Sequence, residues 1–164
     1  MEEIEITIGR LLREKGLTLG TVESATGGLI AHRLTNVPGS SDYFKGAVTA
    51  YSNEIKIRLA GVPRATIESY GAVSAETAQA MAAGGRGALQ VDICIADTGI
   101  AGPGGAVGDK PVGLFYLGLA HGDMVESRRF LFSGTREENK QAAAAAALDW
   151  LARHLTGLRQ SNKK

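Results

Sequence analysis

The chain has 164 residues, 44% of them hydrophobic and 21% charged, which excludes a disordered protein and is typical of one globular domain. Its 18 basic and 17 acidic side chains leave a net charge of +1, so no overall field attracts nucleic acid or an anionic membrane. The single cysteine, Cys94, excludes a disulfide within the chain. The acidic N-terminus is unlike a signal peptide and no apolar run is long enough to span a bilayer, so we expect a cytoplasmic protein.

Helical and extended patterns alternate along the first part of the chain. Apolar residues recur at helical spacing from Ile4 to Leu12, and Gly16 is a typical C-terminal stop. Short apolar runs between glycine and polar residues then predict strands and further helices. In chain order we expect a helix over 3–15, a strand over 17–24, a helix beginning near Leu29, a strand over about 43–51, a short helix capped by Asn53, a helical turn within 61–71, and a longer helix from Ser74 to about Leu89.

The second part of the chain predicts a buried strand over 91–97, a glycine-rich loop over 98–113 and a hairpin with strands at 112–120 and 124–132. Thr135 and Glu138 have the spacing of a capping box before an alanine-rich final helix. Strands that alternate with helices, followed by a hairpin and a helix, predict a three-layer α/β/α sandwich with a mixed, mostly parallel sheet. We expect one domain over 1–164, with its core at about 3–158 and a frayed basic tail.

Three loops that combine glycine or small residues with hydroxyl groups follow three predicted strands: "ESATGG", "AYSNEIK" and "DTGIAGPGG". Ligands of open α/β sheets bind beyond the carboxyl ends of the strands, and glycine lets backbone amides approach an anion. The Walker A spacing and the Gly-x-Gly-x-x-Gly fingerprint are both absent. A structural turn is therefore the simpler interpretation of each loop taken alone.

Ser24 and Lys56 are the residues in these loops that could carry covalent chemistry. Ser24 follows the first strand, where its hydroxyl could cap a helix or point into a cleft; if Thr26 is the cap, Ser24 is free. Lys56 could be an ordinary solvated lysine, or a base if burial lowers its pKa, which it can do by roughly 3–5 units. Serine–lysine pairs are a known means of activating a hydroxyl, but spacing alone does not show that Ser24 and Lys56 meet.

Other chemistries have weaker support in the sequence. His32, His121 and His154 are dispersed without metal-ligand spacing, and we expect His121 to be exposed in a turn. Glu23 and Asp97 are the carboxylates at corresponding strand ends. Glu23 could bond a loop backbone, and Asp97 could bind a ribose hydroxyl or a metal, although we favour a role in bracing the glycine loop. We therefore expect no metal site.

Five segments in order together resemble the CinA C-terminal domain family: "ESATGGLIAHRLTNVPGSSDYFKGAVTAYSNEIKIRLAGV", "YGAVSAET", "TGIAGPGG", "KPVG" and "SGTREENK". The resemblance covers about residues 5–155. It implies an α/β/α sandwich, and, through the PncC-type nicotinamide mononucleotide amidohydrolases of that family, a stand-alone hydrolase of a linear carboxamide. Its expected reaction converts nicotinamide mononucleotide into nicotinate mononucleotide and ammonia without a cofactor, as a step in NAD recycling. It also implies a homodimer or a higher homo-oligomer.

The resemblance also implies roles for particular residues. The family's nucleophilic serine falls on Ser24, its active-site tyrosine on Tyr51 and its active-site lysine on Lys56. Ser24 would attack the carboxamide carbon while Lys56, assisted by Tyr51, takes and returns the proton. The remaining expected binding residues are the amides of Thr26, Gly27 and Gly28 for the oxyanion, Thr98, Gly99, Ala101 and Gly102 of the 98–105 loop for the ribose-phosphate, and Lys110 and Arg136 for the phosphate. A structural salt bridge is the alternative role for Arg136.

The chain departs from the family pattern at three positions. Ala25 replaces the usual cysteine, and Thr135 replaces a common aspartate that could have paired with Arg136. Asp97 replaces a small or apolar residue, and its carboxylate would repel the substrate phosphate or alter the loop. Two alternatives therefore remain open: a non-catalytic nucleotide-binding or competence-related interaction module, and an amidohydrolase of a different amide.

Overall fold

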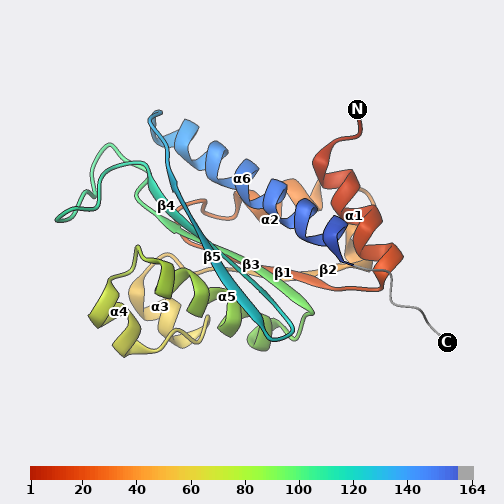
Figure 1. Cartoon of the computed structure of the whole chain (residues 1–164), viewed down its shortest axis with the longest axis horizontal. Helices are drawn as coiled ribbons and strands as arrows, with labels where there is room; N and C mark the ends of the chain where they lie inside the picture. The colour runs from red at the N-terminus through yellow and green to blue at the C-terminus, as the bar shows by residue number, and fades with distance from the viewer. Residues whose placement is uncertain (159–164) are drawn as a thin grey trace.

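The computed structural model describes residues 1–158, and the expected frayed tail at 159–164 lies outside the described residues. A five-stranded sheet lies between two layers of helices (Figure 1), as the sequence predicted. The elements in chain order are α1 (Ile4–Lys15), β1 (Leu19–Glu23), α2 (Leu29–Thr35), the 3-10 turn η1 (Ser40–Asp42), β2 (Phe44–Thr49), α3 (Asn53–Arg58), α4 (Arg64–Tyr70), α5 (Ala75–Leu89), β3 (Ile93–Gly99), β4 (Leu114–His121), β5 (Met124–Leu131) and α6 (Arg136–Gly157).

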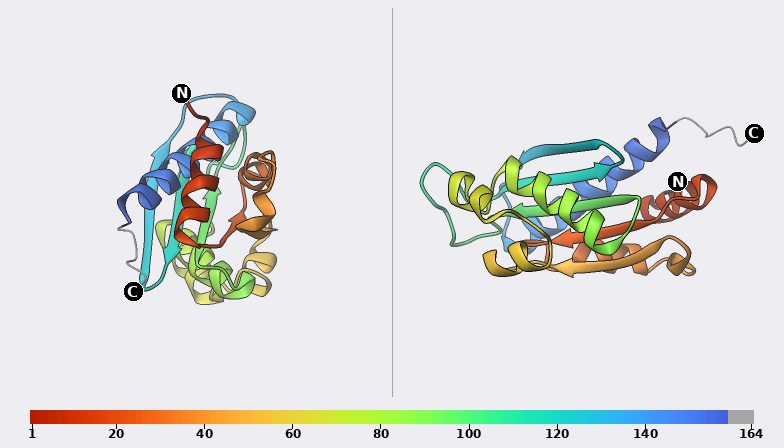
Figure 2. Two further views of the ribbon diagram at one scale, coloured as in Figure 1. Left: turned by 90° about the vertical axis from the view of Figure 1, so that its right-hand side faces the viewer. Right: turned by 90° about the horizontal axis from the view of Figure 1, so that it is seen from below.

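The strand order across the sheet is β2-β1-β3-β4-β5. β1 pairs in parallel with both β2 and β3, whereas β4 runs antiparallel to β3 and to β5. The sheet is therefore mixed, with β4 alone running against the other four strands. Helices α1, α2 and α6 cover one face and α3, α4 and α5 lie on the other (Figures 1 and 2).

The alanine-rich helix α6 packs closely against the sheet and α1. Ala143, Ala144 and Ala147 are fully buried in this layer, where small side chains let the helix approach the strands. On the opposite face Gly85 lets α5 approach the strands, because a Cβ at this position would lie 2.2 Å from Cγ2 of Val22. Cys94 is buried beside it, and burial raises the pKa of its thiol to about 12, so it serves as a small core residue.

Local signals in the sequence explain where several helices begin and end. Gly16 takes a left-handed conformation at the end of α1, Ser74 caps α5, and Thr135 forms the predicted capping box with Glu138 at α6. The expected cap of α3 was wrong by one residue: Ser52, rather than Asn53, accepts a hydrogen bond from the amide of Ile55.

Because β2, β1 and β3 are parallel, their carboxyl ends meet at one edge of the sheet, and the three glycine- and hydroxyl-rich loops converge there. The long loop after β3 projects beyond this edge (Figure 2).

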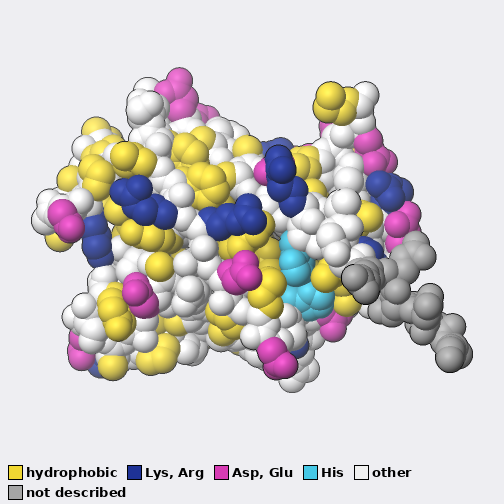
Figure 3. Space-filling view, viewed as in Figure 1, with side chains coloured by type: hydrophobic (Ala, Val, Ile, Leu, Met, Phe, Trp, Pro, Cys, Tyr) yellow, Lys and Arg dark blue, Asp and Glu magenta, His cyan; other side chains and the backbone are white. Residues whose placement is uncertain are grey.

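Lys and Arg side chains are interspersed with Asp and Glu on the face shown in Figure 3. No helix within residues 1–158 is both long and apolar enough to cross a membrane.

Candidate active site

Ser24 and Lys56 meet at the carboxyl edge of the sheet although they lie on different elements. Ser24 follows β1, and Lys56 projects from α3 toward it. The Lys56 Nζ atom lies 3.0 Å from Ser24 Oγ and 3.3 Å from the carbonyl oxygen of Tyr51. Only 2% of Lys56 and 7% of Ser24 are exposed. The two residues therefore form a buried hydroxyl–amine pair at the end of β1.

Burial also changes the proton affinity of Lys56. Desolvation lowers the pKa of its ammonium group, and the negative charge of Asp97 partly opposes this shift. Lys56 Nζ donates to both Ser24 Oγ and the carbonyl oxygen of Tyr51. In the neutral amine the same 3.0 Å contact would let the nitrogen lone pair accept the proton of Ser24. The observed contacts fit that arrangement.

Tyr51 lies beside Lys56, and its expected assistance in proton transfer stays a prediction. Its main-chain carbonyl, not its phenol, contacts Lys56. The residue is 62% exposed, and its hydroxyl accepts a hydrogen bond of 3.0 Å from Arg136. Tyr51 therefore lies at the rim of the site, where α6 meets the loop after β2.

A fully buried carboxylate, Asp97 of β3, holds the turn that carries Ser24. Asp97 accepts hydrogen bonds from the amides of Ser24 (3.0 Å) and Thr26 (3.2 Å) and from the hydroxyl of Thr26. Burial raises the pKa of Asp97 to about 6, and Glu23 adds to this while the hydrogen bonds oppose it. Asp97 braces the serine turn rather than the glycine loop and does not line the cleft, so the expected direct repulsion of a substrate phosphate has no support here.

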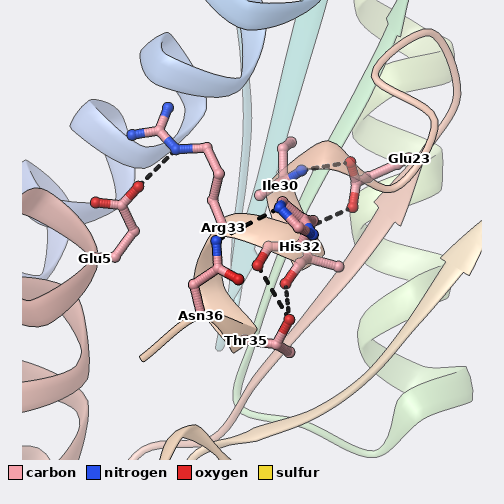
Figure 4. A network of polar contacts seen from close by, with 8 residues as sticks. Glu5, Glu23, Ile30, His32, Arg33, Thr35 and Asn36 are labelled. Carbon is pink, nitrogen blue, oxygen red and sulfur yellow. Dashed lines mark hydrogen bonds and ion pairs between the residues drawn. The ribbon is translucent and has the colours of Figure 1, made fainter. Parts of the chain in front are cut away.

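Glu23 occupies the N-terminal end of α2, which explains why neither Ser24 nor Thr26 caps this helix. Its carboxylate accepts a hydrogen bond from the amide of Ile30 (2.8 Å), as Figure 4 shows. It also accepts from the amide of Ala31 (2.9 Å) and from the hydroxyl of Thr26 (2.7 Å). An internal anion thus satisfies the first turn of α2. The hydroxyl of Ser24 remains available for chemistry.

Two of the three amides expected to bind the oxyanion are engaged within the protein. The amide of Thr26 donates to Asp97 and that of Gly27 donates to the carbonyl of Ser24 at 3.1 Å, so both are already used. The amide of Gly28 donates no hydrogen bond to another residue within 1–158, but Gly28 lines a different hollow from Ser24. The amide of Ala25 donates no hydrogen bond to another residue within 1–158, and Ala25 lines the cleft. Ala25 is a candidate that sequence reasoning missed, although the residue after a nucleophilic serine supplies such an amide in other hydrolases.

Most of the predicted residues line one cleft of about 260 Å³. Predicted residues on its walls are Ser24, Tyr51, Lys56, Thr98, Gly99, Ala101 and Arg136, and Ile100, Gly104 and Gly105 belong to the predicted 98–105 loop. The lining residues that the sequence did not predict for the site are Ala25, Asn53, Ala72 and Val73. The hydroxyl of Thr98 donates to the carbonyl of Ala72 at 2.7 Å and so helps to hold the wall. Lys110 lies outside the cleft and donates to the carbonyl of Tyr70.

Thr26, Gly27 and Gly28 line a second hollow, of about 600 Å³, between α2 and the beginning of α6. Arg136 lines both spaces, and Lys140 lines the second. The guanidinium of Arg136 donates to the carbonyl of Gly102 (2.8 Å) and to Tyr51. No carboxylate within the described part of the chain pairs with it, so the alternative of a structural salt bridge is not found there.

The histidines lie apart from this site or at its margin. His121 and His154 contact each other at 2.9 Å, so His121 is half-buried rather than exposed as expected, and burial lowers the pKa of both rings. His32 lines the second hollow. Among residues 1–158 no group of three or more metal-ligating side chains comes together.

The chain is similar to proteins of one family over nearly its whole length. Residues 1–155 match the CinA C-terminal domain. The sequence is 50% identical to a CinA-like protein of Geobacter sulfurreducens, over 93% of this chain and 37% of that protein. It is 44% identical to a CinA-like protein of Geotalea uraniireducens, over 98% of this chain and 38% of that one. The chain thus spans little more than a third of these relatives.

Solved structures show the same fold. The competence damage-inducible protein A of Klebsiella pneumoniae superposes with a TM-score of 0.92 at 29% identity, covering 95% of this chain and 97% of that one. A competence/damage inducible protein of Agrobacterium tumefaciens superposes with a TM-score of 0.86 at 35% identity and the same coverage.

Proposed function

The chain belongs to the CinA C-terminal domain family, and from this membership and the Ser24–Lys56 pair we propose that it is an amidohydrolase of nicotinamide mononucleotide. The observation that carries the proposal is the 3.0 Å contact between a buried lysine amine and a serine hydroxyl at the cleft. The choice of substrate rests on the resemblance to the PncC-type members of the family.

The proposed reaction proceeds in two stages. Neutral Lys56 accepts the proton of Ser24 as Oγ attacks the carboxamide carbon, and the amide of Ala25 donates to the developing oxyanion. Lys56 then returns the proton to the departing amine, and ammonia leaves an ester on Ser24. Water attacks this ester, Lys56 takes the proton from water and gives it to Ser24 Oγ, and nicotinate mononucleotide is released.

Arg136 supports a position for the substrate phosphate. Its charge has no carboxylate partner within the described residues, and it lines both the Ser24 cleft and the hollow that Lys140 lines. Arginine recognises phosphate through two parallel hydrogen bonds. We therefore place the nicotinamide ring beside Ser24 and the phosphate beside Arg136, rather than beside Lys110, whose ammonium is held by Tyr70.

Ammonia release from a set of related amides tests this proposal. The purified chain is incubated with nicotinamide mononucleotide, free nicotinamide and the dinucleotide, and binding of each is measured by calorimetry. We expect release from the mononucleotide alone. Release from another amide would replace the substrate and keep the hydrolase. Tight binding of the mononucleotide without release would contradict the enzyme and favour the interaction module that the relatives' competence-related names raise.

A further inference from the structure

The proposed reaction makes no use of Asp97, although this carboxylate bonds the turn that carries Ser24. Asp97 has no exposed surface, and its oxygens accept from the amides of Ser24 and Thr26. Burying an aspartate costs free energy unless its carboxylate is well hydrogen-bonded. An uncharged acceptor could also accept hydrogen bonds from the surrounding amides. A structural brace alone does not explain why the buried group is an acid.

The surroundings of Asp97 join it electrostatically to the reacting pair. The charge of Glu23 of β1 acts on Asp97, and the charge of Asp97 in turn acts on Lys56 of α3. The residue paired with Asp97 on β4 is the apolar Leu117. The hydroxyl of Thr26 lies between the two carboxylates and contacts both. Glu23 bonds the amides of α2. Asp97 is the acid that bonds the amide of Ser24, whose hydroxyl lies 3.0 Å from Lys56 Nζ.

We propose that Asp97 is a positioning residue for the Ser24–Lys56 pair: its carboxylate holds the serine turn, and its negative charge sets the pH range in which Lys56 accepts a proton. This inference rests on the proposed function. Asp97 bonds the amides of Ser24 and Thr26, on either side of Ala25, and Ala25 itself lines the cleft.

The direction of the electrostatic effect follows from the charges. Ionised Asp97 stabilises the ammonium form of Lys56 and so raises its pKa, against the lowering caused by burial. Lys56 must be neutral to act as a base, so activity rises as pH increases through the pKa of Lys56. Removing the charge of Asp97 lets Lys56 become neutral at lower pH, and the acidic limb of the pH–rate profile moves the same way.

Two uncharged variants test the inference, Asp97→Asn and Asp97→Ser, each first checked for folding by thermal unfolding. We expect the acidic limb for mononucleotide hydrolysis to move to lower pH by about one unit, with a reduced plateau rate from the loosened turn. Asp97→Glu retains the charge and should keep the acidic limb at its wild-type pH. An unmoved limb in a folded, active, uncharged variant would show that Asp97 is a brace only.

Asp92 supplies a matched control at the other end of β3. It accepts hydrogen bonds from the amide (2.8 Å) and hydroxyl (2.9 Å) of Thr18, so it also braces the start of a strand, far from the reacting pair. Asp92→Asn should reduce stability and leave the limb in place. A shift of equal size in this variant would contradict a specific role for Asp97.

Nuclear magnetic resonance of the unmutated protein separates this inference from the proposed function. The protein is labelled with ¹⁵N-lysine, and the side-chain signal of Lys56 is assigned by its loss in Lys56→Met. The chemical shift of this signal should show an inflection near pH 6, where Asp97 ionises. This readout needs neither activity nor an Asp97 variant. If the signal inflects but no ammonia is released, the electrostatic link stands and the proposed function fails. If ammonia is released and the signal has no inflection, the inference on Asp97 is wrong.

Discussion

Lys56 derives its proposed chemistry from its surroundings rather than from its type. Its ammonium group is nearly completely buried, whereas the chain's other described lysines are exposed or half-buried. Burial lowers the pKa of Lys56, and the pair with Ser24 gives the neutral amine a proton to accept. The same residue in solvent would remain protonated at neutral pH.

Replacement of Lys56 by methionine tests this role, because methionine has similar length and no basic group. We expect the kcat for ammonia release to fall by at least about 100-fold, the usual contribution of a general base. The folded state should persist, since the variant removes a costly buried amine. Lys45→Met is the control, because among residues 1–158 the ammonium of Lys45 donates only to the carbonyls of Ser41 and Asp42. A fully active Lys56→Met variant would rule out lysine catalysis.

Arg136 is predicted to act on the phosphate and not on the amide. Arg136→Ala should raise the KM for nicotinamide mononucleotide by about tenfold, the loss of a charge-assisted hydrogen bond. The KM for the corresponding riboside, which has no phosphate, should change little. Steady-state kinetics with both substrates checks this. Equal losses on the two would indicate instead that Arg136 acts by positioning Tyr51, with which it shares a hydrogen bond.

At the scale of elements, two glycines of α5 test how the helix is seated on the sheet. A Cβ at Gly85 would lie 2.2 Å from Val22 and 2.9 Å from the sulfur of Cys94, whereas one at Gly87 would meet nothing within 4 Å. Gly85→Ala should lower the free energy of unfolding by about 1–3 kcal/mol through overpacking. Gly87→Ala should raise it by up to about 1 kcal/mol, since alanine favours helix. Chemical denaturation distinguishes the two, and equal effects would contradict the close approach of α5 to β1.

Most elements could be predicted from the sequence because their signals are local. Gly16 ends α1, Ser74 starts α5 and the Thr135–Glu138 pair starts α6, each within a few residues of the pattern that indicates it. The cap of α3 was misassigned because Ser52 and Asn53 are adjacent and both are good caps. The choice between them depends on which side chain reaches the amide of Ile55, which is a property of the folded turn.

The site was harder to predict because its contacts join distant parts of the chain. Ser24 and Lys56 are 32 positions apart, and Asp97 reaches the serine turn from a strand 73 positions beyond Ser24. Resemblance to a family indicated the first pair, but no local pattern indicates that Asp97 braces Ser24 or that Glu23 satisfies α2. The placement of Tyr51 and of the Thr26–Gly28 segment was not predicted for the same reason, because both depend on the distant helix α6.

At the scale of the whole molecule, buried Asp97 gives stability a dependence on pH. Its pKa in the folded protein is raised from 3.8 to about 6. The protonated form therefore contributes stability that is complete below about pH 4 and is lost as the pH rises through about 6. At about 1.4 kcal/mol per unit, the loss amounts to about 3 kcal/mol. The free energy of unfolding of the wild type relative to Asp97→Asn should therefore decrease between pH 4 and pH 7, and a constant difference would contradict a raised pKa.

The central claim is that Ser24, activated by Lys56, is the nucleophile of an amidohydrolase, and one paired assay tests it most directly. Ammonia release from nicotinamide mononucleotide is measured for the wild type, for Ser24→Ala and for Ser41→Ala, a control at an exposed serine of η1. The account predicts release by the wild type and by Ser41→Ala and none by a folded Ser24→Ala. Release that persists in Ser24→Ala would contradict it.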